Sequence, residues 1–263
     1  MQIEKTLHIK LNSEDVGKYA IVPGDPARCE IIAKFLDNPK KIQQNREHIT
    51  YVGYLEGEKI VVTSTGMGGP STAICIEELY KCGVDTFLRI GTGASTSSKV
   101  SKGDVIVING AVRMEGTGLH YLPMEFPAVP DYNFTKKLEE TSLDLGYTTN
   151  VGVTITKDSF YTQIEPETKP IGYELINRWN SYVKGGAICT AMEEATLFLV
   201  ASSLNARAAS VLVSATDYVG KVSSDISSKG YPSNYIERAI RVGIESLRKI
   251  ILEDRNAKTE WEK

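Results

Sequence analysis

The 263-residue chain lacks several features that would assign a protein to a class at once. No apolar run approaches the roughly 20 residues that a membrane-spanning helix requires. The formal net charge is only −3 and no basic stripe is present, which argues against a nucleic-acid interface. The N-terminal stretch MQIEKTLHIK is too polar, and its apolar part too short, for a secretory signal. These absences predict a soluble, cytoplasmic protein whose partners include neither a membrane nor a nucleic acid.

Cysteine and histidine are both scarce. The four cysteines are Cys29, Cys75, Cys82 and Cys189. Their spacing fits neither a metal site nor a disulfide framework, so we expect free thiols in a reducing compartment. The three histidines are His8, His48 and His120. Because no Ser–His–Asp arrangement and no metal-ligand cluster is apparent, we expect neither nucleophilic catalysis nor zinc chemistry.

The chain is rich in short apolar segments of two alternating kinds, and 41% of its residues are hydrophobic. Runs rich in Val, Ile and Thr predict strands at Tyr19–Val22, Tyr51–Leu55, Ile60–Ser64, Thr86–Ile90, Val105–Asn109, Val151–Ile155 and Ala208–Ser214. Helical periodicity predicts helices at Ser71–Cys82, Met192–Ser203 and Tyr235–Leu252. We therefore expect an α/β protein, a three-layer α/β/α sandwich with a mixed central β-sheet. No linker interrupts the pattern, which predicts a single domain over residues 1–254 and a charged tail over residues 255–263.

Three of the predicted strands end in glycine-rich turns, two of them beside an arginine. PGDPAR follows Val22 and contains Arg28, TGMGGPST follows Ser64, and FLRIGTGAS places Arg89 inside an apolar strand. Glycines let backbone N–H groups approach an anion, and arginine adds a charged, two-pronged donor. A single cluster of this kind is usually only a turn, but three of them favour an oxyanion site. Since a buried arginine rarely lacks a partner, Arg89 requires an acidic neighbour or an anionic ligand.

Two adjacent acids, Glu193 and Glu194, open the apolar helix predicted at Met192–Ser203. Neighbouring positions of a helix point in different directions, so one carboxylate could face solvent and the other a site. A carboxylate in a site can accept two hydrogen bonds, as a ribose diol would offer. The plainer interpretation, which the residues alone favour, is that both acids interact with the helix dipole.

The chain resembles the nucleoside phosphorylase-I family, and in particular its bacterial uridine phosphorylase branch. The motifs that carry the resemblance occur in the family's order; they are VPGDPAR, NREHITY, STGMGGPST, FLRIGT, EFPAVPDYNF, KDSFY and AMEEATL. They span about His8 to Ser214. The resemblance implies a Rossmann-like α/β sandwich and a homo-oligomer, commonly a hexamer built as a trimer of dimers with active sites shared across the dimer interface. The implied reaction is reversible phosphorolysis, in which a nucleoside and inorganic phosphate give a free base and ribose 1-phosphate without an obligate cofactor.

The resemblance also implies a role for individual residues. The residues implied to bind phosphate are Gly24, Arg28, Arg89 and Thr92 of one subunit and Arg46 of its neighbour. Those implied to bind ribose are Met192, Glu193 and the neighbour's copy of His8. Those implied to bind the base are Phe160 and Gln163. The pair implied to hold an optional monovalent cation, such as potassium, is Glu47 and Ser71.

The chain departs from the family pattern near the base and the sugar. The arginine that usually follows the glutamine is absent, and Thr168 and Lys169 stand there instead, so Thr168 becomes a candidate base-binding residue. The usual acid before the Met-Glu pair is replaced by Ala191, and Gly93 changes the floor of the pocket. None of these departures removes a phosphate-binding residue, so we expect phosphorolysis with an altered base or sugar pocket.

Because of Asp217, the sequence does not decide between a pyrimidine and a purine as the preferred base. It lies about where the purine branch of the family keeps a general-acid aspartate, although a turn acid at a strand end is an equal alternative. The predicted catalytic residues are therefore Arg89, Glu193 and Asp217, with Asp217 also at the base. A hydrolytic nucleosidase would have no use for Arg28, Arg46 and Arg89. The remaining alternatives to a uridine phosphorylase are a purine nucleoside phosphorylase and a weakly catalytic nucleoside-binding protein.

Overall fold

The computed structural model describes residues 4–218 and 233–261. The strands in these residues are β1 (Tyr19–Ile21), β2 (Asp37–Asn45), β3 (His48–Leu55), β4 (Glu58–Thr63), β5 (Thr86–Ser95), β6 (Val105–Met114), β7 (Thr149–Lys157), β8 (Cys189–Ala191) and β9 (Arg207–Ser214). The helices are α1 (Ala27–Ala33), α2 (Gly69–Cys82), η1 (Thr117–His120), α3 (Tyr132–Asp144), α4 (Tyr161–Ile164), η2 (Pro166–Thr168), α5 (Gly172–Lys184), α6 (Glu194–Ser203) and α8 (Ser233–Trp261). A search of the described helices for a membrane-spanning candidate, by length and hydropathy, finds none.

The strands form one mixed sheet in the order β2-β3-β4-β1-β5-β8-β7-β6-β9. β1 pairs in parallel with both β4 and β5, whereas β2, β3 and β4 are antiparallel. β9 also pairs in parallel with β5, from Thr86↔Arg207 to Gly93↔Ser214. This second pairing joins the two ends of the series β5-β8-β7-β6-β9, so these strands close into a ring. The predicted mixed sheet is confirmed, whereas the closure has no counterpart in the sequence pattern.

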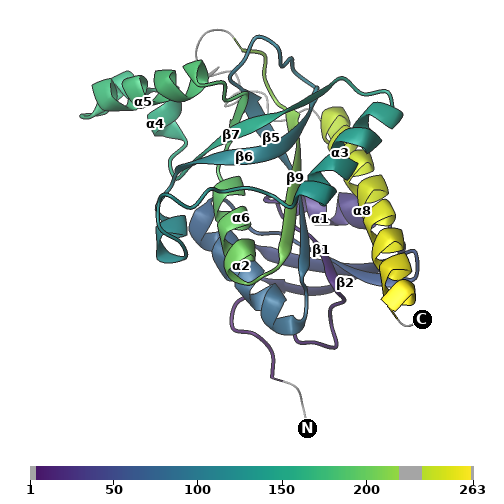
Figure 1. Cartoon of the computed structure of the whole chain (residues 1–263). Helices are drawn as coiled ribbons and strands as arrows, with labels where there is room; N and C mark the ends of the chain where they lie inside the picture. Colours follow the sequence, from purple (N-terminus) through teal and green to yellow (C-terminus); the bar gives the residue numbers. More distant parts are fainter. Residues whose placement is uncertain (1–3, 219–232, 262–263) are drawn as a thin grey trace.

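Helices cover both faces of the sheet, as predicted (Figure 1). α1, α3 and α8 lie over one face, and α2 and α6 lie over the other. Each face of the sheet packs against a hydrophobic core, and successive residues of a strand point alternately into the two cores because the strand is pleated. In β1, for example, Tyr19 and Ile21 pack into the core under α8, and Ala20 packs into the core under α2. β1, β4, β5 and β9 run in parallel and present their carboxyl ends to one edge, where ligands of such sheets gather, whereas β6, β7 and β8 run the opposite way.

The structure contains elements that the sequence pattern did not indicate. They are β2, β8, α1, α3, α4 and α5. β2 has the polar sequence DNPKKIQQN and is mostly exposed, so no apolar alternation marks it as a strand. α8 is longer than predicted and runs to Trp261, through most of the segment expected as a charged tail. α4 and α5 follow β7 and lie at the end of the sheet (Figure 1).

Candidate active site

A cavity of about 420 Å³ opens at the carboxyl end of the parallel strands. Its walls come from six places in the chain: the turn after β1, the turn between β2 and β3, the segment after β4, the strand β5, the segment from the end of β7 into α4, and the segment from β8 to α6. The volume lies in the range of pockets that hold small organic ligands. Apolar side chains line part of the cavity, among them Met67, Phe160 and Met192. Three cationic side chains also line it, those of Arg28, Arg89 and Lys157. The cavity can therefore hold a molecule that is partly apolar and partly anionic.

Arg89 forms the buried centre of the site. Its Nη2 lies 2.5 Å from Oε2 of Glu193, and its Nε lies 2.7 Å from Oε1 of Glu194. Burial alone would lower the pKa of Arg89, but the two carboxylates more than offset this effect, so the pKa stays above its usual value. The expectation that Arg89 requires an acidic neighbour is confirmed. Neither of the two acids faces solvent, because Glu193 is 5% exposed and Glu194 is fully buried, and both contact Arg89.

One guanidinium nitrogen of Arg89 has no partner within the described residues. Its Nη1 is buried and makes no hydrogen bond. The atom faces Gly24, where an added Cβ would lie 3.5 Å from Nη1 and 3.3 Å from the carbonyl oxygen of Gly66. Both glycines line the cavity together with Arg89. An unpaired buried donor is costly, so Nη1 is poised to receive an oxygen atom of an anion that enters the cavity.

A second arginine reaches the same wall from the start of α1. The carboxylate of Asp25 accepts a hydrogen bond from the backbone N–H of Ala27, which fixes the turn into the helix. Arg28 then extends along the wall, with Nη2 3.4 Å from Oγ1 of Thr92 and Nε 3.8 Å from Oδ2 of Asp25. Gly24, Arg28, Arg89 and Thr92, which were predicted to bind phosphate within one subunit, therefore all line one cavity.

Glu193 links this wall to the start of α2. Its Oε1 accepts a hydrogen bond from the backbone N–H of Gly68, at 3.0 Å, and its Oε2 accepts from Met192 N–H as well as from Arg89. Gly68 precedes α2 with a φ of 81°, a conformation that favours glycine. The predicted ribose-binding pair, Met192 and Glu193, lines the cavity, and its carboxylate is held in place by three donors.

The predicted base-binding residues Phe160 and Gln163 line the cavity on the side of β7 and β8. Oε1 of Gln163 lies 3.2 Å from the hydroxyl oxygen of Thr190. Thr168 does not line this cavity: its hydroxyl donates to the Glu165 carbonyl, 2.7 Å away, and also accepts from Lys169. The structure thus brings two of the predicted base-binding residues together.

Two of the departures from the family pattern, Gly93 and Ala191, also line the cavity. A Cβ at Gly93 would lie 3.1 Å from the carbonyl oxygen of Thr190, because β5 and β8 approach closely there. The structure places Asp217, by contrast, away from the cavity. Its side chain is exposed and accepts a hydrogen bond from the backbone N–H of Lys102, at 2.8 Å.

The two residues expected from a neighbouring subunit, His8 and Arg46, lie outside the cavity of their own chain. His8 packs against Glu78, with Nδ1 2.6 Å from its carboxylate, and Arg46 is exposed in the turn between β2 and β3. The two residues are close to each other, since Asn45 Nδ2 donates to the carbonyl oxygen of His8 at 2.6 Å. They therefore share one surface beside the rim of the cavity, where Glu47 contributes to the lining.

Glu47 and Ser71, the predicted cation pair, are in direct contact. The hydroxyl of Ser71 lies 2.7 Å from Oε1 of Glu47 and 2.5 Å from the carbonyl oxygen of Thr65. Hydrogen bonds from its own backbone N–H and from Ser71 lower the pKa of Glu47. Three oxygen atoms thus converge at the rim of the cavity.

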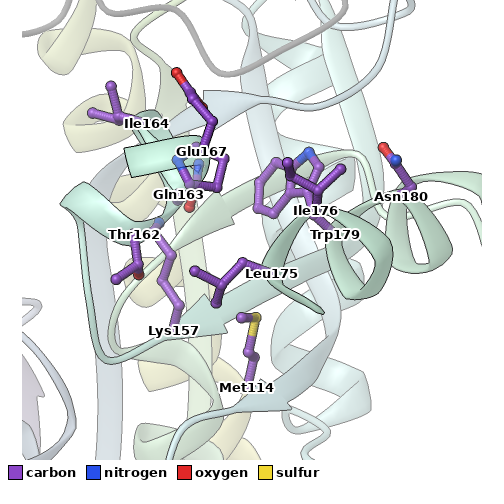
Figure 2. Close-up of a pocket in the computed structure, with 11 residues that line it drawn as sticks. Met114, Lys157, Thr162, Gln163, Ile164, Glu167, Leu175, Ile176, Trp179 and Asn180 are labelled. Atoms are coloured by element: carbon purple, nitrogen blue, oxygen red, sulfur yellow. The ribbon is translucent and has the colours of Figure 1, made fainter. Parts of the chain in front are cut away.

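Reasoning from the sequence missed Lys157. This lysine is the last residue of β7, is 5% exposed and lines the cavity. It also lines a second cavity of about 320 Å³, bounded by α4 and α5, and so does Gln163 (Figure 2). A related signal, a cation that closes a run rich in β-branched residues, was present in VGVTITK and could have identified Lys157.

Comparison with known proteins agrees with this geometry. Residues 18–251 match the model of the phosphorylase superfamily. The uridine phosphorylase of Treponema pallidum is 38% identical over 247 residues, which cover 94% of this chain and 95% of the relative. The uridine phosphorylase of Escherichia coli is 36% identical over 95% of this chain and 100% of its own length. The guanosine phosphorylase of Halorubrum lacusprofundi is 33% identical over 92% of this chain and 98% of its own length. The resemblance to the nucleoside phosphorylase family is confirmed.

Proposed function

The chain belongs to the phosphorylase superfamily, and we propose that it catalyses the reversible phosphorolysis of a nucleoside, with uridine as the preferred substrate. Relatives named uridine phosphorylase, at 36–40% identity over most of the chain, support this activity and place it among the pentosyltransferases. The products are a free base and ribose 1-phosphate. Inorganic phosphate is a co-substrate, and the reaction requires no further cofactor.

A single observation carries the proposal: the buried Nη1 of Arg89, a residue that lines the cavity, has no hydrogen-bond partner among the residues that the structure describes. An arginine needed only for stability would be satisfied by the carboxylates of Glu193 and Glu194. The spare donor, together with Arg28 and the hydroxyl of Thr92 on the same wall, matches the tetrahedral oxygens of phosphate. A hydrolase that uses water would have no need for this arrangement.

The mechanism follows from the charges of the site. Cleavage of the glycosidic bond builds positive charge on the ribose, and a phosphate anion held beside the sugar stabilises this charge and attacks the same carbon. Arg28 and Arg89 orient the phosphate and keep it in place. Glu193, immobilised by Gly68 N–H and Arg89, accepts hydrogen bonds from the ribose hydroxyls. The catalytic step therefore needs positioning and electrostatics rather than a nucleophilic side chain.

The active form is a homo-oligomer, a hexamer assembled from three dimers, in which each cavity is completed by the partner's Arg46 and the partner's His8. The position of both residues on one surface beside the rim supports this arrangement. The four cysteines are buried and free, which suits the reducing cytoplasm as the place of action.

Glu47, Ser71 and the carbonyl of Thr65 fit a monovalent cation such as potassium. Their three oxygen atoms already converge, and hard cations prefer oxygen ligands. A bound potassium ion would neutralise the charge of Glu47 and tie the turn between β2 and β3 to the start of α2.

The test is the release of base from uridine, thymidine, inosine, guanosine and adenosine, each with and without phosphate. We expect uracil release that depends on phosphate. Equal release without phosphate would indicate a hydrolytic nucleosidase and contradict the proposal. Saturable nucleoside binding with no turnover at any phosphate concentration would indicate a binding protein instead.

A second candidate is phosphorolysis of a purine nucleoside, which the guanosine phosphorylase among the relatives favours. In that reaction Asp217 would protonate the departing purine, which requires it to leave its contact with Lys102 and reach the cavity. Guanosine or inosine turnover above that of uridine would favour this candidate. If purine turnover is lost in a folded Asp217→Asn variant, Asp217 supplies the proton to the departing purine.

A further inference from the structure

Lys157 is a buried cation without an ion-pair partner among the described residues. It ends β7, opposite Met114 of β6, with 5% of its surface exposed. Its Nζ donates one hydrogen bond, to the hydroxyl oxygen of Thr190 at 2.9 Å. A lysine ammonium has three N–H donors, and lysine is almost never fully buried unless it is paired. Two of the three donors therefore await acceptors that the described part of the chain does not supply.

The charged groups that the structure describes near Lys157 change its pKa without forming an ion pair with it. Glu193 and Glu194 favour its protonated form, as does Cys189, yet burial outweighs them and lowers its pKa to about 8. Glu167, which lines the second cavity with Lys157, forms no ion pair with it. The ammonium is thus protonated at neutral pH but poorly compensated. Such a group gains most from an acceptor that develops negative charge beside it.

Lys157 stands at the end of the main cavity that holds the base-binding residues. Thr190, its hydrogen-bond partner, pairs with Ala94 of β5, five residues beyond Arg89. This spacing corresponds to roughly 16 Å along the strand. Lys157 shares both cavities with Gln163, and Figure 2 shows its side chain extending toward Gln163 and Thr162. The main cavity is therefore lined by a second buried cation besides Arg89, and this cation lies beside the predicted base-binding residue Gln163.

We propose that the ammonium group of Lys157 donates a hydrogen bond to a carbonyl oxygen of the nucleobase and stabilises the base as it leaves. This inference rests on the proposed phosphorolysis. In that reaction a phosphate oxygen forms a bond to the anomeric carbon, and the C–N glycosidic bond breaks. The electron pair of that bond remains on the base, whose carbonyl oxygens share the negative charge. A proton from solvent then gives the neutral base. A uracil anion, with two carbonyl groups, is the kind of leaving group that Lys157 fits.

A purely structural role makes a different prediction. Lys157 would then only balance the buried carboxylates of Glu193 and Glu194, and its removal would weaken folding or slow every substrate alike. The two roles differ in how the rate responds to the leaving group. Fluorine at carbon 5 of uracil stabilises the base anion through the ring, so 5-fluorouridine depends less on a protein donor than uridine does.

The test compares Lys157→Met with the wild type on uridine and 5-fluorouridine at saturating phosphate. We expect kcat for uridine to fall by about 10²-fold, the loss typical of one donor to a developing oxyanion, and kcat for 5-fluorouridine to fall by much less. Lys136→Met makes the same substitution at an exposed position of α3, and we expect wild-type rates from it. Equal losses on the two substrates, or no loss, would overturn the inference. If the wild type itself releases no uracil, the proposed function fails first, so the two failures are distinguishable.

Lys157→Arg provides a second measurement if the methionine variant does not fold. In the wild type, kcat for uridine should fall as pH rises through about 8, because the ammonium loses its proton and its charge. A guanidinium stays protonated across this range, so the falling limb should move to higher pH in Lys157→Arg. If kcat of a folded Lys157→Arg variant falls over the same pH range as kcat of the wild type, the titrating group is not Lys157. This result would count against the inference.

Discussion

Among single residues, Arg89 shows how one side chain serves both stability and function. Nε and Nη2 are bound to the carboxylates of Glu194 and Glu193, and Nη1 is left for the ligand. A lysine could not divide its bonds in this way, because it lacks the planar fork of the guanidinium. The ion pairs that fix the guanidinium also immobilise Glu193, so the residues proposed to bind phosphate and ribose are oriented together.

Removal of Arg89 should destabilise the fold as well as abolish activity. Arg89→Met leaves two buried carboxylates without their cation, and we expect the free energy of unfolding to fall by about 3–5 kcal/mol. The measurement is unfolding in urea. Glu194→Gln added to Arg89→Met should recover part of this loss, since it removes one of the uncompensated charges. A single variant as stable as the wild type would contradict the role of Arg89 in the core.

The sequence predicts much of the site and misses the relation between its parts. The pattern around Arg89 predicted an acidic neighbour or an anionic ligand, and the structure contains the acidic neighbours and leaves one buried donor unpaired within the described residues. It did not predict that Glu193 and Glu194 would both turn toward Arg89, because that depends on the angle at which α6 meets β5. Lys157 was missed because a lysine at a strand end usually reaches solvent, whereas here it is buried between the main cavity and the cavity bounded by α4 and α5.

Among the elements, α8 shows how closely a helix can lie on the sheet. Gly243 is buried in this helix, and a Cβ there would lie 2.6 Å from Cδ1 of Ile90 and 3.2 Å from Cδ2 of Leu88. Both of those side chains belong to β5, the strand that carries Arg89. The glycine allows α8 to approach the strand on the face opposite α2 and α6. The helix thus supports the site from behind without contributing a residue to it.

Gly243→Ala should therefore be destabilising, although alanine is the better helix former. We expect the crowding against Ile90 and Leu88 to reduce the free energy of unfolding by about 1–3 kcal/mol, measured in urea. Gly110→Ala is the matched control, because a Cβ there lies 3.7 Å from its nearest neighbour, Cγ2 of Val153, in ordinary contact. A Gly243→Ala variant more stable than the wild type would mean that α8 can move away from β5 at no cost.

The elements that the sequence revealed are those with an apolar side and a regular period. The strand at Tyr19–Ile21 and the helix at Gly69–Cys82 were found within a few residues of their observed ends. β2 was missed because it is an exposed antiparallel strand that carries little hydrophobic signal, so its existence depends on tertiary contacts. α5 was missed although its apolar residues Leu175, Ile176 and Trp179 recur at a helical spacing and line the second cavity.

At the scale of the whole molecule, the proposed oligomer makes each chain complete the cavity of its partner. Arg46 and His8 share one surface, while Arg28 and Arg89 lie in the cavity of the same chain. In a dimer with twofold symmetry, the same patch faces itself, so each chain would give its Arg46 to the other and receive one in return. A cavity is then complete only when its own chain supplies Arg28 and the partner chain supplies Arg46.

Complementation between two inactive variants tests this exchange. Arg28→Ala and Arg46→Ala should each lose phosphorolysis, and unfolding and refolding them together should restore about a quarter of the wild-type sites. Half of the dimers are then mixed, and one site of each mixed dimer has both arginines. The control is the two variants mixed after separate refolding and assayed at once. If joint refolding gives no more activity than this control, Arg46 is not supplied by the partner.

The closed ring of strands has a consequence for the newly synthesised chain. β5 is complete once Ser95 is made, but β9 ends at Ser214, and Arg89 meets its carboxylates 104 and 105 positions further along. At common rates of translation, the interval from Arg89 to Ser214 lasts roughly 6 to 25 s. During that time the nascent chain holds a half-built sheet and an arginine whose carboxylates have not been made. Chaperones that shield nascent chains should therefore matter most for this protein while residues 95 to 214 are being translated.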